Sequence, residues 1–443
     1  MKIQLPVDVK IIVDTIQNAG YEAYVVGGCV RDSILMREPD DWDITTSAKP
    51  EEVKKIFRKT VDTGLIHGTV TVLFHGVGYE VTTYRIDGEY EDSRHPKEVK
   101  FTANLLEDLK RRDFTINAMA YNETVGLVDA FGGMDDIKNK VIRAVGDPRE
   151  RFNEDALRMM RAIRFSAQLN YHLEEETKRA IIELSPTIAN ISAERIQVEF
   201  LKLVVSDHPE KVRELYEAGI SKIIMPEFDK IMNTEQNNPH HSFSVGEHTI
   251  KSMLEVQADK VLRLSMFFHD FGKADTMTED ENGIHHFYGH PERSEKLVLE
   301  ILKRLKFDND TITKVAKIVK YHDFHPETNK KAVRKAIHKI GEDIMLYLFD
   351  VNRADILAQS DYGRAAKLQK LEETIRLYHE IIEEGQCVSL KTLAVTGKDL
   401  IEAGITPGKE IGVVLANLLE YVLEHPEKNQ KDELLRYLDM IQK

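Results

Sequence analysis

The sequence predicts an α+β fold in which a mixed N-terminal part precedes an all-helical remainder. In the first ~140 residues, short β-branched and aromatic runs alternate with amphipathic stretches, which is typical of strands packed with helices. From about residue 150 onward, apolar residues recur at three- and four-residue spacing, which is typical of helices. This spacing is clearest in ALRMMRAIRFSAQL (156–169) and AERIQVEFLKLVV (193–205).

Composition and cysteine content indicate an ordinary globular protein of a reducing compartment. The chain has 443 residues, of which 42% are hydrophobic and 31% charged, so we expect roughly two to four domains. Its two cysteines, Cys29 and Cys387, cannot form a disulfide framework. No apolar run approaches the ~20 residues of a membrane span, and the N-terminal stretch is typical of an amphipathic helix. We therefore expect a cytoplasmic protein with no membrane partner.

Turn signals and a shift in composition predict four domains. DHP, NNP and GITPG interrupt the helical pattern at 207–209, 237–239 and 404–408. A His-rich composition begins near Asn237 and suggests a separate module. We expect a mixed head, a helical neck, a helical body and a helical tail, which occupy residues 1–150, 151–230, 231–370 and 371–443.

The net charge of −14 is unfavourable for nonspecific binding to nucleic acid, because phosphate contacts dominate that affinity. A nucleic-acid partner would therefore need locally concentrated cations. Residues 303–339 contain eleven Lys or Arg and four Asp or Glu, a local net charge of +7. This stretch is either a surface that binds RNA or a solvated helix face.

Two glycines separate the first expected strand, YEAYVVGG, from the helix that follows. Gly27 and Gly28 would leave backbone N–H groups free at a helix N-terminus, where an anion binds favourably. Arg31 lies one turn into that helix and could reach the same phosphate. Two glycines before a helix are also a common tight turn, so this motif indicates an anion-binding site only together with the motifs that follow it.

Three carboxylates are the candidate metal ligands of the head. Asp41 and Asp43 flank Trp42 at the start of WDITT, which we expect to be a strand, so both side chains would project from one face. Two adjacent carboxylates repel unless a cation lies between them, and Mg²⁺ prefers such oxygen ligands. Glu80, on the expected strand YEVTTYR, could supply a third carboxylate. A two-metal site of this kind can activate an attacking hydroxyl and stabilise a leaving pyrophosphate. A solvated acidic turn is the alternative.

These segments resemble, in order, the motifs of bacterial-type (class II) tRNA nucleotidyltransferases and of the related bacterial poly(A) polymerases. The resemblance rests on GGCVRDSILM, DDWDITT, YEVTTYRIDGEYEDSR, EDLKRRDFTINAMAY, DAFGGMDDI and RFNEDALRMMRAIRFSAQL. It implies a polymerase-β-like nucleotidyltransferase head with helical neck, body and tail. The implied reaction is the addition of C and A from CTP and ATP to tRNA 3′ ends. The resemblance assigns Mg²⁺ to Asp41 and Asp43, the triphosphate to Gly28 and Arg31, the sugar to Arg112 and Asp113, and the base to Asp155 and Arg158.

The assigned base-reading pair is chemically sensible. Cytosine and adenine both offer an exocyclic amine beside an acceptor nitrogen, so a carboxylate and a guanidinium can pair with them and not with uracil or guanine. Arg158, Arg161 and Arg164 would share one helix face, and three arginines there repel unless they meet an anion such as a triphosphate. A surface salt-bridge ladder with Glu154 and Asp155 is the alternative.

Residues 85–101, RIDGEYEDSRHPKEVKF, are similar to the family's flexible loop, which is associated with the switch from C to A addition. This loop favours full CCA addition or A addition. The alternatives are a poly(A) polymerase, an enzyme that adds only A, a phosphohydrolase with an inactive head, and a noncatalytic RNA-binding module.

The body contains a second candidate centre. His248, His269-Asp270 and Asp355 occur in the order typical of an HD-type metal phosphohydrolase, and FFHDFGK is the recognisable core. Histidine and aspartate together bind divalent transition metals or Mg²⁺. His290 and His322 stand where a second metal would find ligands. The module is either active on terminal phosphates of RNA or a helical shell without activity.

The tail resembles the terminal helical region of the family and is expected to contact tRNA. Pro407-Gly408 precedes a helix whose N-terminus could receive a phosphate. A plain helix–turn–helix explains the same pattern.

Overall fold

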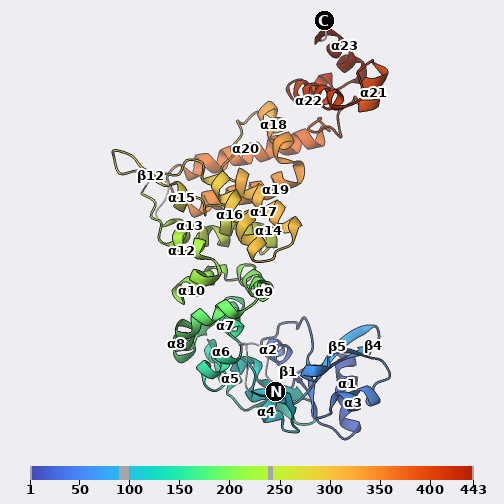
Figure 1. Ribbon diagram of the computed structural model, residues 1–443, viewed down its shortest axis with the longest axis vertical. Coiled ribbons are helices and arrows are strands. Elements are labelled where there is room, and N and C mark those ends of the chain that lie inside the picture. Colours follow the sequence, from blue (N-terminus) through green and yellow to red (C-terminus); the bar gives the residue numbers. More distant parts are fainter. Residues whose placement is uncertain (1, 89–98, 238–242, 442–443) are drawn as a thin grey trace. The chain divides into compact units, whose positions relative to one another are not determined.

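The computed structural model describes residues 2–88, 99–237 and 243–441 (Figure 1). The chain divides into two compact units, Met1–Asp229 and Lys230–Lys443, which we call the N-terminal and C-terminal units. The N-terminal unit combines a mixed sheet with helices, whereas the described residues of the C-terminal unit are helical apart from one small hairpin and the connecting segments. The predicted α+β fold with a helical remainder is therefore confirmed. The finer division into four domains stays a prediction.

A seven-stranded sheet forms the base of the N-terminal unit, in the order β3-β4-β5-β2-β1-β8-β9. Strands β2 and β5 run parallel, and the neighbouring pairs on either side run antiparallel. The central strands β1 and β2 are buried along their whole length. The sheet strands are β1 Ala23–Val26, β2 Ile44–Thr46, β3 Thr60–Gly64, β4 Thr69–Phe74, β5 Val77–Thr83, β8 Met119–Asn122 and β9 Gly126–Asp129.

Helices and short strand pairs complete this unit. Helices α1 and α3 pack on the sheet through β1, β4 and β5 (Figure 1). The helices are α1 Val7–Asn18, α2 Gly28–Ile34, α3 Pro50–Ile56, α4 Leu105–Lys110, α5 Gly133–Asn139, α6 Pro148–Glu154, α7 Leu157–Leu169, α8 Glu175–Leu184, α9 Ala193–Val204, α10 Arg213–Glu217 and α11 Ser221–Ile224. The small strand pairs are β6 Arg85–Asp87 with β7 Val99–Phe101, and β10 Val141–Ile142 with β11 His172–Leu173.

One buried carboxylate ties the middle of the sheet to the RRDFT segment. Asp108, on α4, is fully buried. It accepts hydrogen bonds from Arg111 Nε at 2.9 Å and from Thr45 Oγ1 at 3.2 Å, and Arg112 Nη2 lies 3.5 Å away. Burial by itself would raise the pKa of Asp108, but the two guanidinium groups hold it below its usual value. Because a buried charge is tolerated only when it is paired, this network fixes where Arg112 lies.

The C-terminal unit is a stack of helices with a terminal helical region. Its helices are α13 Val245–Leu254, α14 Lys260–Phe268, α15 Lys273–Thr276, α16 His290–Arg304, α17 Asn309–Tyr321, α18 Lys330–Ile340, α19 Glu342–Ala358, α20 Arg364–Glu383, α21 Gly397–Glu402, α22 Lys409–Glu424 and α23 Lys431–Ile441. The hairpin joins β12 Thr278–Glu279 to β13 His285–His286. Helix α12, Pro226–Met232, spans the division between the units. The last three helices enclose a hydrophobic cluster of their own that includes Leu418 and Leu434.

Short 3₁₀ segments lie at Leu65–His67, Thr115–Asn117, Ser185–Asn190, Pro209–Val212 and Pro426–Lys428. Both cysteines are free and buried. In the part of the chain that the structure describes, we find no helix with the length and apolar character needed to cross a bilayer.

Much of the basic stretch at 303–339 is engaged within the fold. Lys330 contacts Glu384, which follows α20, at 2.7 Å, and Lys335 contacts Glu424 on α22 at 2.8 Å. Arg334 is buried and donates to the carbonyl of Leu423. Each of these exposed ion pairs contributes little to the stability of the fold. Together they show that the N-terminal half of α18 faces acidic side chains. The local surplus of cations is therefore smaller than the sequence alone suggests.

Candidate active sites

The β1–α2 turn has the geometry that the double glycine predicted. Gly27 adopts a φ of 84°, which favours glycine, and a Cβ added there would lie 3.1 Å from Arg112 Nη1. Arg31, on α2, is 8% exposed, and its Nη1 donates to Asn117 Oδ1 at 2.6 Å. Asp32 accepts from Arg31 Nη2 at 2.8 Å. The guanidinium is thus held in one position beside the turn.

Asp41 and Asp43 lie in the irregular segment before β2, and not in the strand that we expected WDITT to form. The strand begins at Ile44, because the chain has to turn before it enters the sheet. The carbonyl of Asp43 nevertheless accepts a hydrogen bond from Val26 N at 3.0 Å, which places this segment beside the end of β1. The two carboxylates therefore converge through the approach to β2 and not through strand alternation.

Electrostatics connects these carboxylates. Loss of surrounding water and the negative charge of Asp41 raise the pKa of Asp43 to about 6; Arg112 opposes this rise and Glu80 adds to it. Glu80 is exposed on β5, which pairs in parallel with β2. Asp43 itself keeps contact with solvent, because the segment borders an open cleft. Asp41 and Asp43 at an open cleft, with Glu80 near enough to repel Asp43, form a donor set suited to a hard divalent cation.

This cleft, of about 760 Å³, gathers most of the residues that the sequence predicted for the head. Of the predicted residues, it is lined by Gly28, Arg31, Asp41, Asp43, Arg112, Asp113, Arg161 and Arg164. Glu80, Asp155 and Arg158 do not line it. The cleft also contains Asn117 and Phe165, which our sequence analysis missed although both lie inside the quoted motifs.

Phe165 gives the cleft an aromatic surface flanked by cations. The guanidinium carbon of Arg164 lies 3.9 Å from the centre of its ring, and that of Arg31 lies 5.0 Å from it. These distances are within the range of cation–π contacts. The ring therefore orders two of the arginines that the cleft presents.

The arginines of α7 meet protein carboxylates in this structure. Arg158 Nη1 lies 2.6 Å from Glu154 Oε2, Arg161 Nη2 lies 2.6 Å from Asp113 Oδ2, and Arg164 Nε lies 2.5 Å from Glu199 Oε2. Although Asp113 is buried, Arg161 holds its pKa well below the usual range. The anion that three arginines on one face require is thus supplied by three carboxylates.

Asp155 is engaged in the same way. Its carboxylate forms a two-pronged pair with Arg195 of α9, at 3.1 and 2.7 Å, and accepts from Leu157 N at 3.1 Å. To pair with a nucleobase, Asp155 would have to exchange Arg195, and Arg158 would have to exchange Glu154. The base-reading role of these two residues stays a prediction. Most of the loop at 85–101, including Arg94 and His95, lies outside the described residues.

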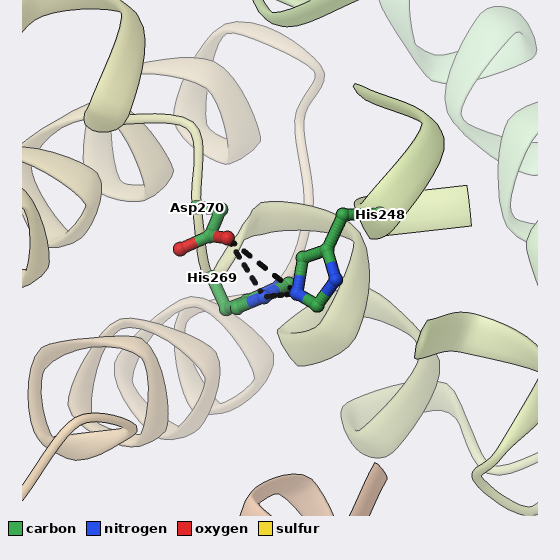
Figure 2. Close-up of side chains that lie close together, drawn as sticks. All are labelled: His248, His269 and Asp270. Atoms are coloured by element: carbon green, nitrogen blue, oxygen red, sulfur yellow. Dashed lines mark hydrogen bonds and ion pairs between the residues drawn. The ribbon is translucent and has the colours of Figure 1, made fainter. Parts of the chain in front are cut away.

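A second cluster lies deep in the C-terminal unit. Figure 2 shows His248 of α13 and His269-Asp270, which follow α14, turned toward one another. The Nε2 atoms of His248 and His269 are 3.3 Å apart, and Asp270 Oδ2 lies 3.2 Å from His269 Nε2. Asp355 of α19 lies 2.8 Å from His248 Nε2. All four ligands that the sequence predicted for the HD module are therefore together.

His290 and His322 form a second triad that shares Asp270. Their Nε2 atoms are 3.2 Å apart, and His290 Nε2 lies 3.4 Å from Asp270 Oδ1. The other oxygen of Asp270 faces the first triad, so one carboxylate is placed between two groups of imidazoles. Lys273 Nζ lies 2.8 Å from Asp270 Oδ2 and supplies a positive charge there.

The histidine tautomers fit a metal. The Nδ1 atoms of His269, His290 and His322 lie 2.7, 2.9 and 2.7 Å from the backbone carbonyls of Met266, Phe287 and Val319. A carbonyl only accepts, so each Nδ1 carries a hydrogen, and each Nε2 can act as a ligand whenever its imidazole is neutral. Metal-binding histidines are oriented in this manner.

The charge balance of the cluster favours a cation as well. Burial lowers the pKa of His290, which keeps that imidazole neutral. Burial also disfavours a charged His269, but Asp270 and Asp355 overcome this and raise its pKa. The two carboxylates therefore favour the protonated, positively charged form of His269. A bound divalent cation could supply that positive charge instead.

Comparisons with known proteins agree with this geometry. The Poly A polymerase head domain matches residues 23–143, and the probable RNA- and SrmB-binding site of polymerase A matches residues 170–232. A putative tRNA nucleotidyltransferase domain 2 matches residues 276–438.

Full-length relatives are similar throughout. The CCA-adding enzyme of Lactobacillus helveticus is 37% identical over 97% of this chain and 95% of its own length. The CCA-adding enzyme of Levilactobacillus brevis is 36% identical over 96% of this chain and 95% of its own length. Among solved structures, the Bacillus stearothermophilus CCA-adding enzyme in complex with CTP has a TM-score of 0.75 at 29% identity, and it covers 98% of this chain and 97% of its own.

We predict that Asp43→Asn stabilises the protein when no divalent cation is present. A carboxyl whose pKa is raised in the folded state costs stability above that pKa, and the cost fades as pH falls through about 6. We therefore expect a gain of about 1 kcal/mol or less at pH 8, since solvent screens the site, and none at pH 4. Denaturant unfolding in chelator measures this. A destabilised variant at pH 8 would contradict the repulsion, and Asp40→Asn is the matched control.

Proposed function

Because the chain belongs to the family of CCA-adding enzymes, we propose that its acidic cleft adds C and A from CTP and ATP to the 3′ ends of tRNA. The observation that carries the proposal is the convergence of Asp41 and Asp43 with Arg31 and Arg112 around one open cleft. Carboxylates that repel one another and arginines held in place are what a nucleoside triphosphate and its metal require.

Each group in the cleft has a chemical task. Asp41 and Asp43, with Glu80 nearby, hold Mg²⁺, which when bound supplies Lewis-acid stabilisation of the charge on the triphosphate. The Gly28 N–H, at the turn into α2, and Arg31 receive the triphosphate. Arg112 and Asp113, which line the same cleft, are proposed to contact the sugar. Phe165 lines the same cleft and packs against the guanidinium groups of Arg31 and Arg164.

Base choice is proposed to come from Asp155 and Arg158. In the absence of nucleotide these groups pair with Arg195 and Glu154. A base that offers an amine beside an acceptor nitrogen can replace both partners at once, whereas a base with a carbonyl beside an N–H cannot. A buried mismatch of this kind costs about 1–3 kcal/mol, which suffices to reject U and G.

The poly(A) polymerase alternative has less support. The head domain model carries that name, but the relatives that match along nearly the whole chain are CCA-adding enzymes. The head is not degenerate either, since its carboxylates and arginines form one cleft. Binding of tRNA is further proposed for the terminal helical region.

The geometry of the C-terminal unit supports a second activity. Two imidazole pairs share Asp270, and three of the four imidazoles, those of His269, His290 and His322, bind a main-chain carbonyl through Nδ1 and turn Nε2 toward the centre. We propose that this cluster, which we call the His–Asp cluster, binds divalent transition-metal ions or Mg²⁺ and hydrolyses phosphate groups at RNA ends. A 2′- or 2′,3′-cyclic phosphate would block the hydroxyl that the head needs, so its removal would restore a substrate for CCA addition.

We predict that Asp41→Ala and Asp43→Ala each lower CCA addition by about three orders of magnitude or more, because the cations lose their carboxylate ligands. Binding of tRNA should stay near the wild-type level. The measurement uses tRNA that lacks its CCA end, each nucleoside triphosphate in turn, and Mg²⁺. A variant that kept more than a few per cent of the rate would refute the assignment of the centre.

Asp155→Ala should relax base choice more than it weakens binding of the triphosphate, because this carboxylate is proposed to contact the base edge and not the phosphates. Incorporation of all four nucleotides measures this. Arg195→Ala is the control: it removes the same ion pair and leaves the carboxylate in place. If both variants changed base choice equally, Asp155 would act through the contact between α7 and α9 and would not read the base.

Asp270→Ala should remove hydrolysis of 2′,3′-cyclic nucleotide and of phosphate-blocked RNA, and should leave CCA addition to intact tRNA unchanged. The reason is that Asp270 belongs to both triads. His322→Ala, which removes a ligand of the second triad alone, should reduce bound metal by about half. Assays with Mg²⁺, Mn²⁺ and Ni²⁺, together with metal analysis, test both statements. If the wild-type protein hydrolysed none of these substrates with any metal, the cluster would be a structural remnant.

A further inference from the structure

A cavity of about 300 Å³ lies beside the His–Asp cluster, and neither the nucleotidyltransferase activity nor the metal ligands account for it. Helices α19 and α20 form most of its wall, and the segment after α17 closes one side. Its floor is apolar and consists of Ile340, Met345, Leu348, Phe349, Ile356 and Leu371. Apolar side chains of this size normally fill such a space, so an open cavity here indicates a ligand pocket.

The cavity shares part of its wall with the cleft at the cluster. Asp355, Gln359 and Asp323 line both the cavity and the cleft of about 360 Å³ that opens onto Asp270, His290 and His322. Asp355 faces the cluster with Oδ1, and its Oδ2 accepts from Gln359 Nε2 at 2.8 Å. Gln359 Oε1 in turn accepts from Lys367 Nζ at 2.5 Å. This chain of hydrogen bonds begins at a metal ligand and ends at the mouth of the cavity.

The lining specifies the kind of group that fits. Apolar walls and the ring of Phe349 suit the faces of a planar group, while the exposed Lys370 and the Oδ1 atom of buried Asn352 suit polar edges. A bare phosphate gains nothing from such walls. A nucleobase has apolar faces and a polar edge, and it is joined through a sugar to the phosphate that the cluster would bind.

We infer that this cavity holds the nucleobase of a nucleotide whose terminal phosphate lies at the His–Asp cluster. The inference rests on the proposed phosphohydrolase function, and it names the substrate as a nucleotide or RNA end rather than a small phosphate ester. A rival position exists on the other side of the cleft, where Tyr288 is 77% exposed and stacks on His286 with ring centres 5.5 Å apart.

The test compares adenosine 2′,3′-cyclic phosphate with its abasic analogue, 1-O-methylribose 2′,3′-cyclic phosphate, on the full-length protein loaded with Mn²⁺. Equilibrium binding and hydrolysis are both measured. Leu371→Trp fills the cavity with a larger side chain. Lys370→Glu changes an exposed residue of the cavity lining, so it should not disturb the fold. Lys398→Glu, at an exposed lysine of α21, is the charge-matched control. CCA addition reports that each variant is folded.

We expect wild type to bind the adenosine compound about tenfold or more tightly than the abasic one, because the base occupies the cavity. Leu371→Trp and Lys370→Glu should reduce this preference and leave hydrolysis of the abasic compound near the wild-type rate. Tyr288→Ala and Lys398→Glu should change neither. Equal binding of the two compounds by wild type, or a preference lost in Tyr288→Ala and kept in both cavity variants, would overturn the inference. If neither compound were hydrolysed, the phosphohydrolase function would fail, while the binding measurement would still decide where the base lies.

Discussion

Both centres of this protein are organised by carboxylates that the fold places close together or buries. In the N-terminal unit, burial and the negative charges of Asp41 and Glu80 raise the pKa of Asp43 to about 6. In the C-terminal unit, Asp270 and Asp355 draw a proton onto buried His269. In each case the fold holds carboxylates against their mutual repulsion or against burial, at a cost that a bound cation would remove. The arrangement of the surrounding helices and strands follows from this requirement.

The sheet order explains how the head meets the requirement. Because β2 lies between β1 and β5, the segment that carries Asp43 runs past the end of β1 and next to the strand that carries Glu80. The glycine turn after β1 then lies close to the carboxylates, and buried Asp108 holds Arg112 toward them. Residues from three distant parts of the sequence thus surround one cleft without a long loop.

The sequence predicted the elements and most of the site because both leave strong local patterns. TVTVLF became β4 residue for residue, and the four expected HD ligands met. The strand at WDITT was wrong by two residues, since β-branched Ile44–Thr46 form the strand and the acidic residues before them do not. Pattern reasoning also could not foresee that Asp155 pairs with Arg195, or that Arg161 pairs with Asp113, because those partners lie 40 and 48 positions apart in the chain. Phe165 was overlooked because an aromatic residue in a helix normally indicates core packing.

The orientation of the His–Asp cluster has a consequence for how its sequence can diverge. His269, His290 and His322 each donate Nδ1–H to the main-chain carbonyl three positions earlier, at the end or start of a helix. Main-chain carbonyls are present whatever the side chain, so Met266, Phe287 and Val319 can be replaced without altering these tautomers. The outer shell that prepares the imidazoles is therefore supplied by helix termini, and it leaves no signature in the amino-acid sequence. Homologues with unlike residues around the histidines can retain the same capacity for metal, and loss of that capacity should be read from the ligands themselves.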